Sequence, residues 1–462
     1  MSSFSGLNTA LSALRYNRVA MDVASGNIAN VSTEGYARRR VNAEAVGAPD
    51  RPAMWSRYAG AGDGVAVGSL DRMTDPLLDI RARREHSSQS YLDIQQSVLE
   101  RVETGVGEPG DNGVAAALAD FRSGWHDLAN NPGSDAARAQ VLGRAQTLAD
   151  SIRVQARNID NESSDLRFRV QSNIAEVNTI AGDLANTNKS IAIATLNGTD
   201  AGVLLDKRDQ LALRLSELTG ASATARPDGG FDVSVNGVPL VTGSKAGQLQ
   251  IATGITPAGA SDGLPLTYQI VDASGTTPVP AGVTGELGGV TDLLTTTLPA
   301  YTAGLDAVAK QLADEINAQH ALGYDATGAP GLPLFSYNPA NPASSLSVAI
   351  GSPSQVAASG VPGGNLDAGN ATALAGATTV ENSYQKLVNG FGTQVASVRR
   401  LAANQQVLTS QVDGSREQLS GVNLDEEMTN MLASQHAYEA AARVMTTVDS
   451  VLDTLINRTA VH

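Results

Sequence analysis

The stretch NIANVSTEGYARRR, residues Asn27 to Arg40, separates two kinds of sequence. Before it, residues recur at steps of three and four, which indicates one face of an amphipathic helix: Leu7, Leu11, Leu14, Arg18, Met21, Ser25 and Ile28. Within it, Asn30 and Gly35 are typical turn residues. After it, Val41, Ala43 and Ala45 alternate with polar residues, as in a strand. A catalytic loop, a nucleic-acid patch and a structural turn all agree with this stretch alone.

The C-terminal end carries a second helical stripe with the same spacing. Its members are Leu424, Met428, Met431, Gln435, Tyr438, Ala442, Met445, Asp449, Leu452 and Ile456. Gln435 and Asp449 interrupt it, as polar residues do at positions that specify register. A long helix with one apolar face is marginal alone, so it needs a partner of similar length. The N-terminal helix of the same chain and the equivalent helices of neighbouring copies are both candidates.

The middle of the chain predicts further helices on both sides of a segment of different residue composition. Helical periodicity covers 77–98, 118–128, a long helix capped by Ser134, 204–218, 301–321 and 378–419. From 221 to 297 the chain is rich in Gly, Pro, Thr and Val, and FDVSVNGVPLVTG predicts a hairpin at Asn236-Gly237. We expect a mainly α, elongated, multi-domain fold with paired, coiled-coil-like terminal helices and an inserted β domain. The expected units are 1–35 with 420–462, 36–220 with 298–419, and 221–297.

Composition excludes several classes of function. The net charge of −15 disfavours nucleic acid, and Arg38 to Arg40 are flanked by Glu34 and Glu44. Without cysteine there is no disulfide, thiolate metal site or cysteine nucleophile. No segment has the length of apolar sequence that membrane insertion needs, and the N-terminus does not look like a cleaved signal peptide. These rules alone predict a soluble, cytoplasmic protein.

No motif predicts catalysis or a cofactor. GAGDGVAVG (60–68) resembles a phosphate loop but leads into a strand rather than a helix. The histidines are scattered, as surface or packed side chains are: His86, His126, His320, His436 and His462. Asp206 and Asp209 alternate with Lys207 and Arg208, which we interpret as a solvated helix face with local ion pairs. We therefore expect no enzyme, no metal and no cofactor.

ASGNIANVSTEGYARRRV (24–41) resembles the N-terminal signature of bacterial flagellar rod, hook and hook-associated proteins, with Glu34 where proline is common. More of the chain is similar to one family among them, flagellar hook-associated protein 1, which joins hook to filament. The similar segments are 62–83, 117–149, 204–218, 235–243, 305–335 and 420–458.

The resemblance implies a structural adaptor at the hook–filament junction that polymerises through its terminal helices. It implies contacts with neighbouring copies, hook protein, a second junction protein and filament. It also implies unfolded export by the flagellar type III system without a cleaved signal peptide, so an extracellular location replaces the cytoplasmic one.

The residues expected to pack between subunits are Leu7, Leu11, Leu14, Met21, Ile28, Leu424, Met428, Leu452 and Ile456. Before assembly, the C-terminal stripe is expected to bind an export chaperone through Met431, Tyr438, Met445 and Leu452. Asn30, Gly35 and Tyr36 are expected to form a structural turn, with the arginines facing acidic residues of other subunits.

Two other functions remain open on the sequence. Another axial protein, of the hook or distal rod, would share the first 45 residues. A secreted cell-wall enzyme with axial-type termini would need a paired-carboxylate or metal site between 221 and 376, and no motif there suggests one.

Overall fold

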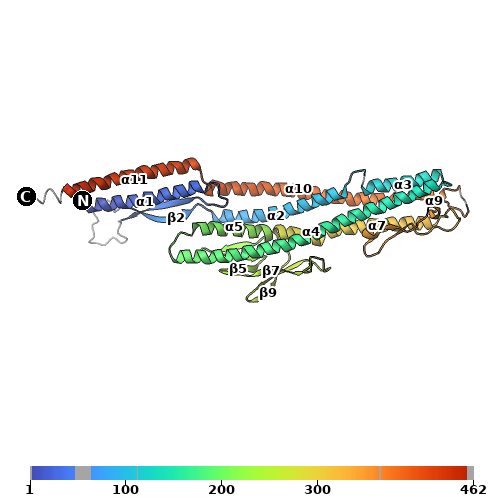
Figure 1. Cartoon of the computed structure of the whole chain (residues 1–462), viewed down its shortest axis with the longest axis horizontal. Coiled ribbons are helices and arrows are strands. Elements are labelled where there is room, and N and C mark those ends of the chain that lie inside the picture. Colours follow the sequence, from blue (N-terminus) through green and yellow to red (C-terminus); the bar gives the residue numbers. More distant parts are fainter. Residues whose placement is uncertain (1–2, 47–63, 112, 364–365, 455–462) are drawn as a thin grey trace, which may run out of the picture.

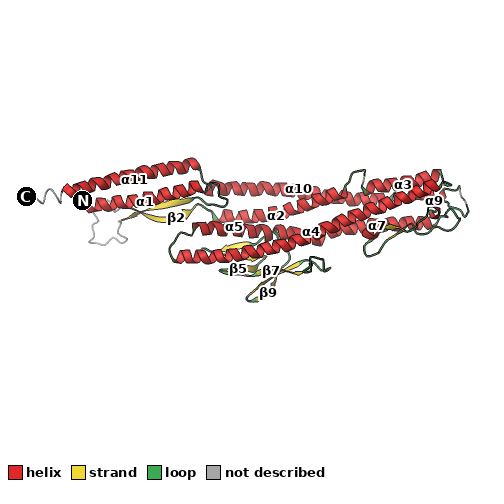
Figure 2. Cartoon of the chain, viewed as in Figure 1, coloured by secondary structure: helices red, strands yellow, loops and turns green. Residues whose placement is uncertain are grey.

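The computed structural model describes residues 3–46, 64–111, 113–363 and 366–454. It is an elongated molecule in which the first and the last described helices lie at one tip (Figure 1). Figure 2 shows long helices with small sheets to one side, which confirms the predicted fold class. The helices are α1 (Ser3–Ala29), α2 (Pro76–Val106), α3 (Val114–Asn130), α4 (Asp135–Leu196), α5 (Gly202–Thr219), α6 (Gly285–Asp292), α7 (Leu298–Ala321), α8 (Pro342–Ser345), α9 (Gly369–Ala375), α10 (Thr379–Ser420) and α11 (Leu424–Asp453).

The strands form small antiparallel sheets. They are β1 (Arg39–Val46), β2 (Gly64–Arg72), β3 (Ser222–Ala225), β4 (Phe231–Val235), β5 (Val238–Thr242), β6 (Lys245–Ala246), β7 (Gln248–Thr253), β8 (Thr267–Asp272), β9 (Gly275–Pro278), β10 (Phe335–Ser336) and β11 (Ser347–Val348). β1 pairs with β2, β10 with β11, and the inserted segment forms the sheets β3-β4-β5-β6 and β7-β8-β9. The hairpin predicted at Asn236-Gly237 is present, with φ angles of 45° and 85°.

The body is organised around α4, which is 62 residues long and begins where predicted. The Ser134 side chain accepts a hydrogen bond from the backbone N–H of Ala137 at 3.2 Å, satisfying one of the free donors at the helix start. α3, α5 and α2 lie along α4, and α10 runs beside α2 (Figure 1). α2 begins at Pro76 after its Asp75 cap.

One detail of the α2 stripe is wrong. The three–four spacing of Leu77, Ile80, Arg84, Ser87, Tyr91, Ile94 and Val98 predicts a buried face that starts at Leu77. In the structure Leu77 and Ile80 are 76% and 53% exposed. The reason is that α2 meets its neighbours there through polar side chains. Asp79 pairs with Arg416 of α10 at 2.9 Å, and apolar burial on α2 begins at Ala82.

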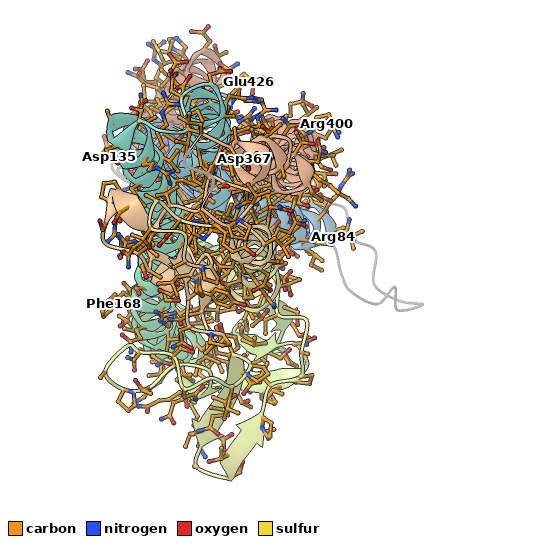
Figure 3. The ribbon with its side chains drawn as sticks, turned by 90° about the vertical axis from the view of Figure 1, so that its right-hand side faces the viewer. Arg84, Asp135, Phe168, Asp367, Arg400 and Glu426 are labelled. Atoms are coloured by element: carbon orange, nitrogen blue, oxygen red, sulfur yellow. The ribbon has the colours of Figure 1, made fainter. Side chains whose placement is uncertain are left out.

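Two asparagines on α4 attach the inserted sheets. The Asn188 amide donates to the carbonyl of Phe231 at 2.8 Å and accepts from the N–H of the same residue at 2.9 Å. The Asn178 amide makes the same pair of bonds with Leu249, at 3.0 and 2.7 Å. Each amide thus satisfies one strand residue on both sides, which a buried strand edge requires. The sheets project sideways from the helical body (Figure 3).

The end of the molecule opposite the chain termini has the aromatic core. Trp125, Phe121 and Phe335 pack edge-to-face with centroids 5.8–6.0 Å apart. His320 is fully buried beside them: its Nδ1–H donates to the carbonyl of Leu332 at 2.6 Å and its Nε2 accepts from the N–H of Ala357 at 2.9 Å. Burial lowers the pKa of His320. It is a packed histidine, as expected from the sequence.

Candidate assembly interface at the terminal helices

α1 and α11 lie antiparallel, side by side, at the tip of the molecule (Figure 1). Near the body, Asn27 contacts Glu427, and near the tip a Cβ placed on Gly6 would lie 3.8 Å from Val448. The two contacts define one register along the whole pair. Of the two partners considered for the C-terminal helix, the N-terminal helix of the same chain therefore occupies one face.

The rest of α11 is poorly covered. Among its described residues only Glu427 is buried, and α1 is its main neighbour. A half-buried inner row consists of Met431, Ser434, Ala441, Met445, Val448 and Leu452. Away from that row, apolar side chains stay 44–50% exposed: Leu424, Met428, Leu432, Val444 and Val451. This exposed apolar surface is a candidate contact surface for other molecules.

The predicted packing residues fall into two groups. Leu7, Leu14, Met21, Ile28 and Leu452 are half-buried within the chain. Leu11, Leu424 and Met428 are exposed, and Ile456 lies outside the described residues. Of the predicted chaperone anchors, Met431, Met445 and Leu452 lie in the inner row and Tyr438 is 37% exposed. The sequence stripe therefore mixes an inner row with an exposed flank, and Gln435 and Asp449 belong to the flank.

The break after α1 is organised by Asn27, which has no exposed surface. Its Oδ1 accepts from the Tyr36 hydroxyl at 2.8 Å and from the Arg39 N–H at 3.0 Å. Its Nδ2 donates to the Arg39 carbonyl and to Glu427 Oε2, both at 2.9 Å. The amide uses all its donors and acceptors, which is the condition for burying it without cost. It joins the end of α1, the start of β1 and the start of α11.

Arg38 holds the other side of Glu427. Its Nη2 lies 2.7 Å and its Nε 2.8 Å from Glu427 Oε1, and its Nη1 lies 3.0 Å from Glu426. Its backbone N–H donates to the carbonyl of Ser420, the last residue of α10, at 2.9 Å. The carboxylate of Glu427 is 4% exposed, so this pair is largely removed from water. We call the cluster of Asn27, Tyr36, Arg38 and Glu427 the joint.

The remaining turn residues surround the joint. Gly35 has a φ of 73°, a left-handed conformation that glycine adopts without strain, and a Cβ there would collide with the side chain of Gln210. Gln210 in turn donates to the carbonyl of Glu34. The Asn30 amide donates back to the carbonyl of Gly26 at 2.9 Å and closes the last turn of α1.

Ion pairs extend from the joint into α5. Arg39 lies 3.1 Å from Asp200 and 3.5 Å from Asp206, and Arg72 of β2 lies 2.6 Å from Asp206 and 2.8 Å from Asp209. Burial raises the pKa of Asp206, and Arg72 and Arg39 oppose that rise. The interpretation of Asp206 as part of a solvated face with local pairs was wrong, since Asp206 is 7% exposed and its partners are distant in sequence. The local pair expected at Asp209 is present, because Asp209 lies 2.6 Å from Arg208.

The arginines after the turn also differ from expectation. Arg38 and Arg39 meet acidic residues of the same chain rather than of other subunits, and Arg40 is exposed. The alternating burial expected for β1 is absent: residues 43–46 are all exposed, because β1 pairs only with β2 and α1 covers little of the hairpin.

A cleft of about 940 Å³ separates the joint from the helical body. Its lining includes polar residues such as Tyr36 and His86 together with apolar ones such as Leu78 and Leu213. His86 of α2 bridges two other helices: its Nδ1 lies 3.3 Å from Glu217 of α5 and its Nε2 lies 3.0 Å from Asp413 of α10. Hydrogen bonding to Glu217, and then to Asp413, raises the pKa of His86 against the effect of burial.

The described residues contain no group of three or more His, Asp or Glu side chains placed to hold a metal ion. None of the described helices combines the length and the apolarity that crossing a membrane requires.

Comparison with known families decides the identity of this architecture. The model described as "Flagellar hook-associated protein FlgK helical domain" matches residues 99–335, half of the chain. The chain belongs to the flagellar hook-associated protein FlgK family. Two further models match the ends: "Flagella basal body rod protein" at residues 7–36 and "Flagellar basal body rod FlgEFG protein C-terminal" at residues 417–458.

Whole-length relatives agree with the FlgK assignment. The chain is 29% identical to flagellar hook-associated protein 1 of Bacillus subtilis (strain 168), over 99% of this chain and 98% of the relative. It is 23% identical to the protein of the same name in Escherichia coli (strain K12), over 98% and 99%. The chain is thus a structural component of the bacterial flagellum with its role at the hook junction.

A solved structure shares the fold. The flagellar hook junction protein FlgK from Burkholderia pseudomallei superposes with a TM-score of 0.64 at 18% identity, over 74% of this chain and all of that one.

We expect Glu427→Gln to loosen the terminal pair more than Glu426→Gln. The first change leaves Arg38 without its buried carboxylate, and a hydrogen bond to a charged group contributes about 1.5–3 kcal/mol. The second removes an ion pair whose carboxylate is 58% exposed, expected to contribute below about 1 kcal/mol. Hydrogen exchange measured on residues 424–453 compares the two. Equal protection in both variants would contradict the role of the joint.

We expect the stabilising effect of His86 to disappear in alkali. Because its folded-state pKa lies above the usual 6.5, the folded protein binds its proton more tightly. The contribution is complete below pH 6.5 and is lost as pH rises through the folded-state pKa. Both carboxylates that His86 contacts also pair with an arginine, Glu217 with Arg214 and Asp413 with Arg416. The difference in unfolding midpoint between the unchanged chain and His86→Gln should shrink as the pH rises above 6.5; a constant difference would refute this.

Proposed function

We propose that this chain is the adaptor that joins hook to filament and that it polymerises through α1 and α11. The observation that supports this most is the terminal pair itself. It extends from the body as two antiparallel helices, with one face of α11 covered by α1 and apolar residues exposed beside it. A surface of this kind needs partners of similar length, and neighbouring subunits of an axial assembly provide them.

The proposed layers follow the sequence units. Residues 1–35 with 420–462 form the inner layer of packed helices, 36–220 with 298–419 form the body, and 221–297 lies outermost. The lateral position of the inserted sheets supports the last of these (Figure 3). The proposed neighbours are further copies of this chain, hook protein, a second junction protein and the filament.

The proposed route to this location is export through the flagellar type III system, unfolded and without a cleaved signal peptide. The absence of cysteine is compatible with this route, because no disulfide has to be broken before export. In this proposal the protein is structural rather than catalytic, with no cofactor, and it neither binds nucleic acid nor inserts into a membrane.

We also propose that a chaperone holds the C-terminal helix before export. The inner row of α11 carries the anchors Met431, Met445 and Leu452, with Tyr438 beside them. α1 half-covers this row in the folded chain, so the chaperone and α1 would compete for one surface. Such competition would keep the terminal helices apart until the chaperone leaves.

Immunogold electron microscopy of isolated flagella should show label in one narrow band between hook and filament. Label along the hook or rod would instead favour another axial role. If flagella carry no label, a secreted enzyme with axial-type ends becomes the better explanation.

Met445→Asp should abolish chaperone binding, whereas Val444→Asp should preserve it. Met445 lies in the half-buried inner row, and its neighbour Val444 is 50% exposed on another side of α11. Isothermal titration of the full-length variants with the cognate export chaperone compares the two. Undiminished affinity of Met445→Asp would remove the proposed anchor.

A further inference from the structure

The solvent-facing side of α1 is one regular row. Between Ala10 and Ala29 the exposed residues recur at steps of four and three: Leu11, Arg15, Arg18, Asp22, Ser25 and Ala29. α11 covers one side of the helix and the β1–β2 hairpin lies against another. Arg15 and Arg18 make no ion pair with any described residue. We call this set the α1 outer row.

α11 has an exposed row of its own, to one side of the face that meets α1. Each of its members lies one residue after a position on the side of α11 that meets α1. The row is therefore rotated by about 100° around the helix axis from that side. Six of them are exposed and Ala442 is half-buried: Met428, Leu432, Gln435, Glu439, Ala442, Thr446 and Asp449. We call this set the α11 outer row.

The two outer rows carry opposite charge. The α1 outer row has two arginines and one aspartate, whereas the α11 outer row has Glu439 and Asp449 and no basic residue. Among the described residues, Glu439 accepts one hydrogen bond, from Gln435 of its own helix at 3.5 Å, and makes no ion pair. Like faces would repel each other, and unlike faces would attract.

The register of the terminal pair places these charges at one height. Asn27 lies opposite Glu427 and Gly6 opposite Val448, so Arg15 is level with Glu439 along the pair. A neighbouring copy at the same height presents its Glu439 level with Arg15 and within one turn of Arg18. No shift along the axis is needed for the rows to meet.

We propose that the α1 outer row of one copy packs against the α11 outer row of the next, with Arg15 and Arg18 facing Glu439. This rests on the assembly function proposed above and specifies its contact. Leu11, Met428 and Leu432 supply apolar surface, and the charges select the partner face. The contact is heterologous: each copy uses its α1 outer row toward one neighbour and its α11 outer row toward another. Repetition gives a ring or a helix, as an axial structure requires.

Disulfide trapping tests this cleanly, because the chain contains no cysteine. Two differently tagged full-length chains, Arg15→Cys and Glu439→Cys, are co-expressed, and isolated flagella are oxidised. We expect a disulfide-linked dimer that carries both tags. Each variant expressed alone should give none, and Arg400→Cys with Glu439→Cys should give none either, since Arg400 lies exposed on α10 of the body (Figure 3).

The alternative outcomes separate the two proposals. If both cysteine variants are found at the junction but form no mixed dimer, this contact is overturned and the adaptor function still stands. Dimers formed by either variant alone would show a like-to-like contact and also overturn it. Absence of the unsubstituted chain from the junction would overturn the adaptor function. If only the cysteine variants failed to incorporate, the neighbouring pair Arg18→Cys and Gln435→Cys would decide by the same criteria.

Charge reversal gives an independent readout. Arg15→Glu with Arg18→Glu should reduce the number of copies recovered with isolated flagella, and adding Glu439→Arg to the same chain should restore them. Arg400→Glu is the matched control and should have no effect. If Glu439→Arg does not restore the number of copies recovered with flagella, the two arginines contact something other than the α11 outer row.

Discussion

The burial of the Glu427 carboxylate constrains the rest of the terminal architecture. A charge removed from water is costly unless partners replace its hydration. Those partners are Arg38 and the amide of Asn27, which come from the opposite end of the sequence. The carboxylate is therefore stable in this position only when both chain ends are in place, so the joint selects the paired arrangement of α1 and α11.

The joint also fixes the direction of the pair relative to the body. Arg39 and Arg72, on the two strands that leave the joint, share Asp206 of α5, and Arg72 reaches Asp209 as well. Backbone bonds from Arg38 to Ser420 and Met73 connect the same point to α10 and to the segment before α2. Charged contacts with defined geometry orient an element more specifically than apolar contacts, which tolerate sliding. The body thus presents the terminal pair at one angle.

The sequence predicted the helices, the hairpin and the turn because each depends on neighbours close in the chain: periodicity, caps, Gly35 and Asn236-Gly237. It did not predict the joint, because Asn27 and Glu427 are 400 residues apart and leave no local pattern. Lys207 and Arg208 made Asp206 look locally paired, which concealed its distant partners. The α11 stripe was interpreted as one face, since Met428 and Met431 are both apolar; only the position of α1 separates the inner row from the exposed flank.

The antiparallel pair is attached to the body at one end only. A small rotation of the pair at the joint therefore causes a large displacement at its free end. α11 has 30 residues, which at 1.5 Å each gives an arm of about 45 Å. A tilt of about 5° at the joint would move the tip by about 4 Å, which is about three quarters of the pitch of one helical turn. The free ends of neighbouring pairs can keep their contacts only if the ion pairs at the joint hold the angle between the terminal pair and the body to within a few degrees. Stiffness at one small polar cluster therefore determines accuracy at the far end of the molecule.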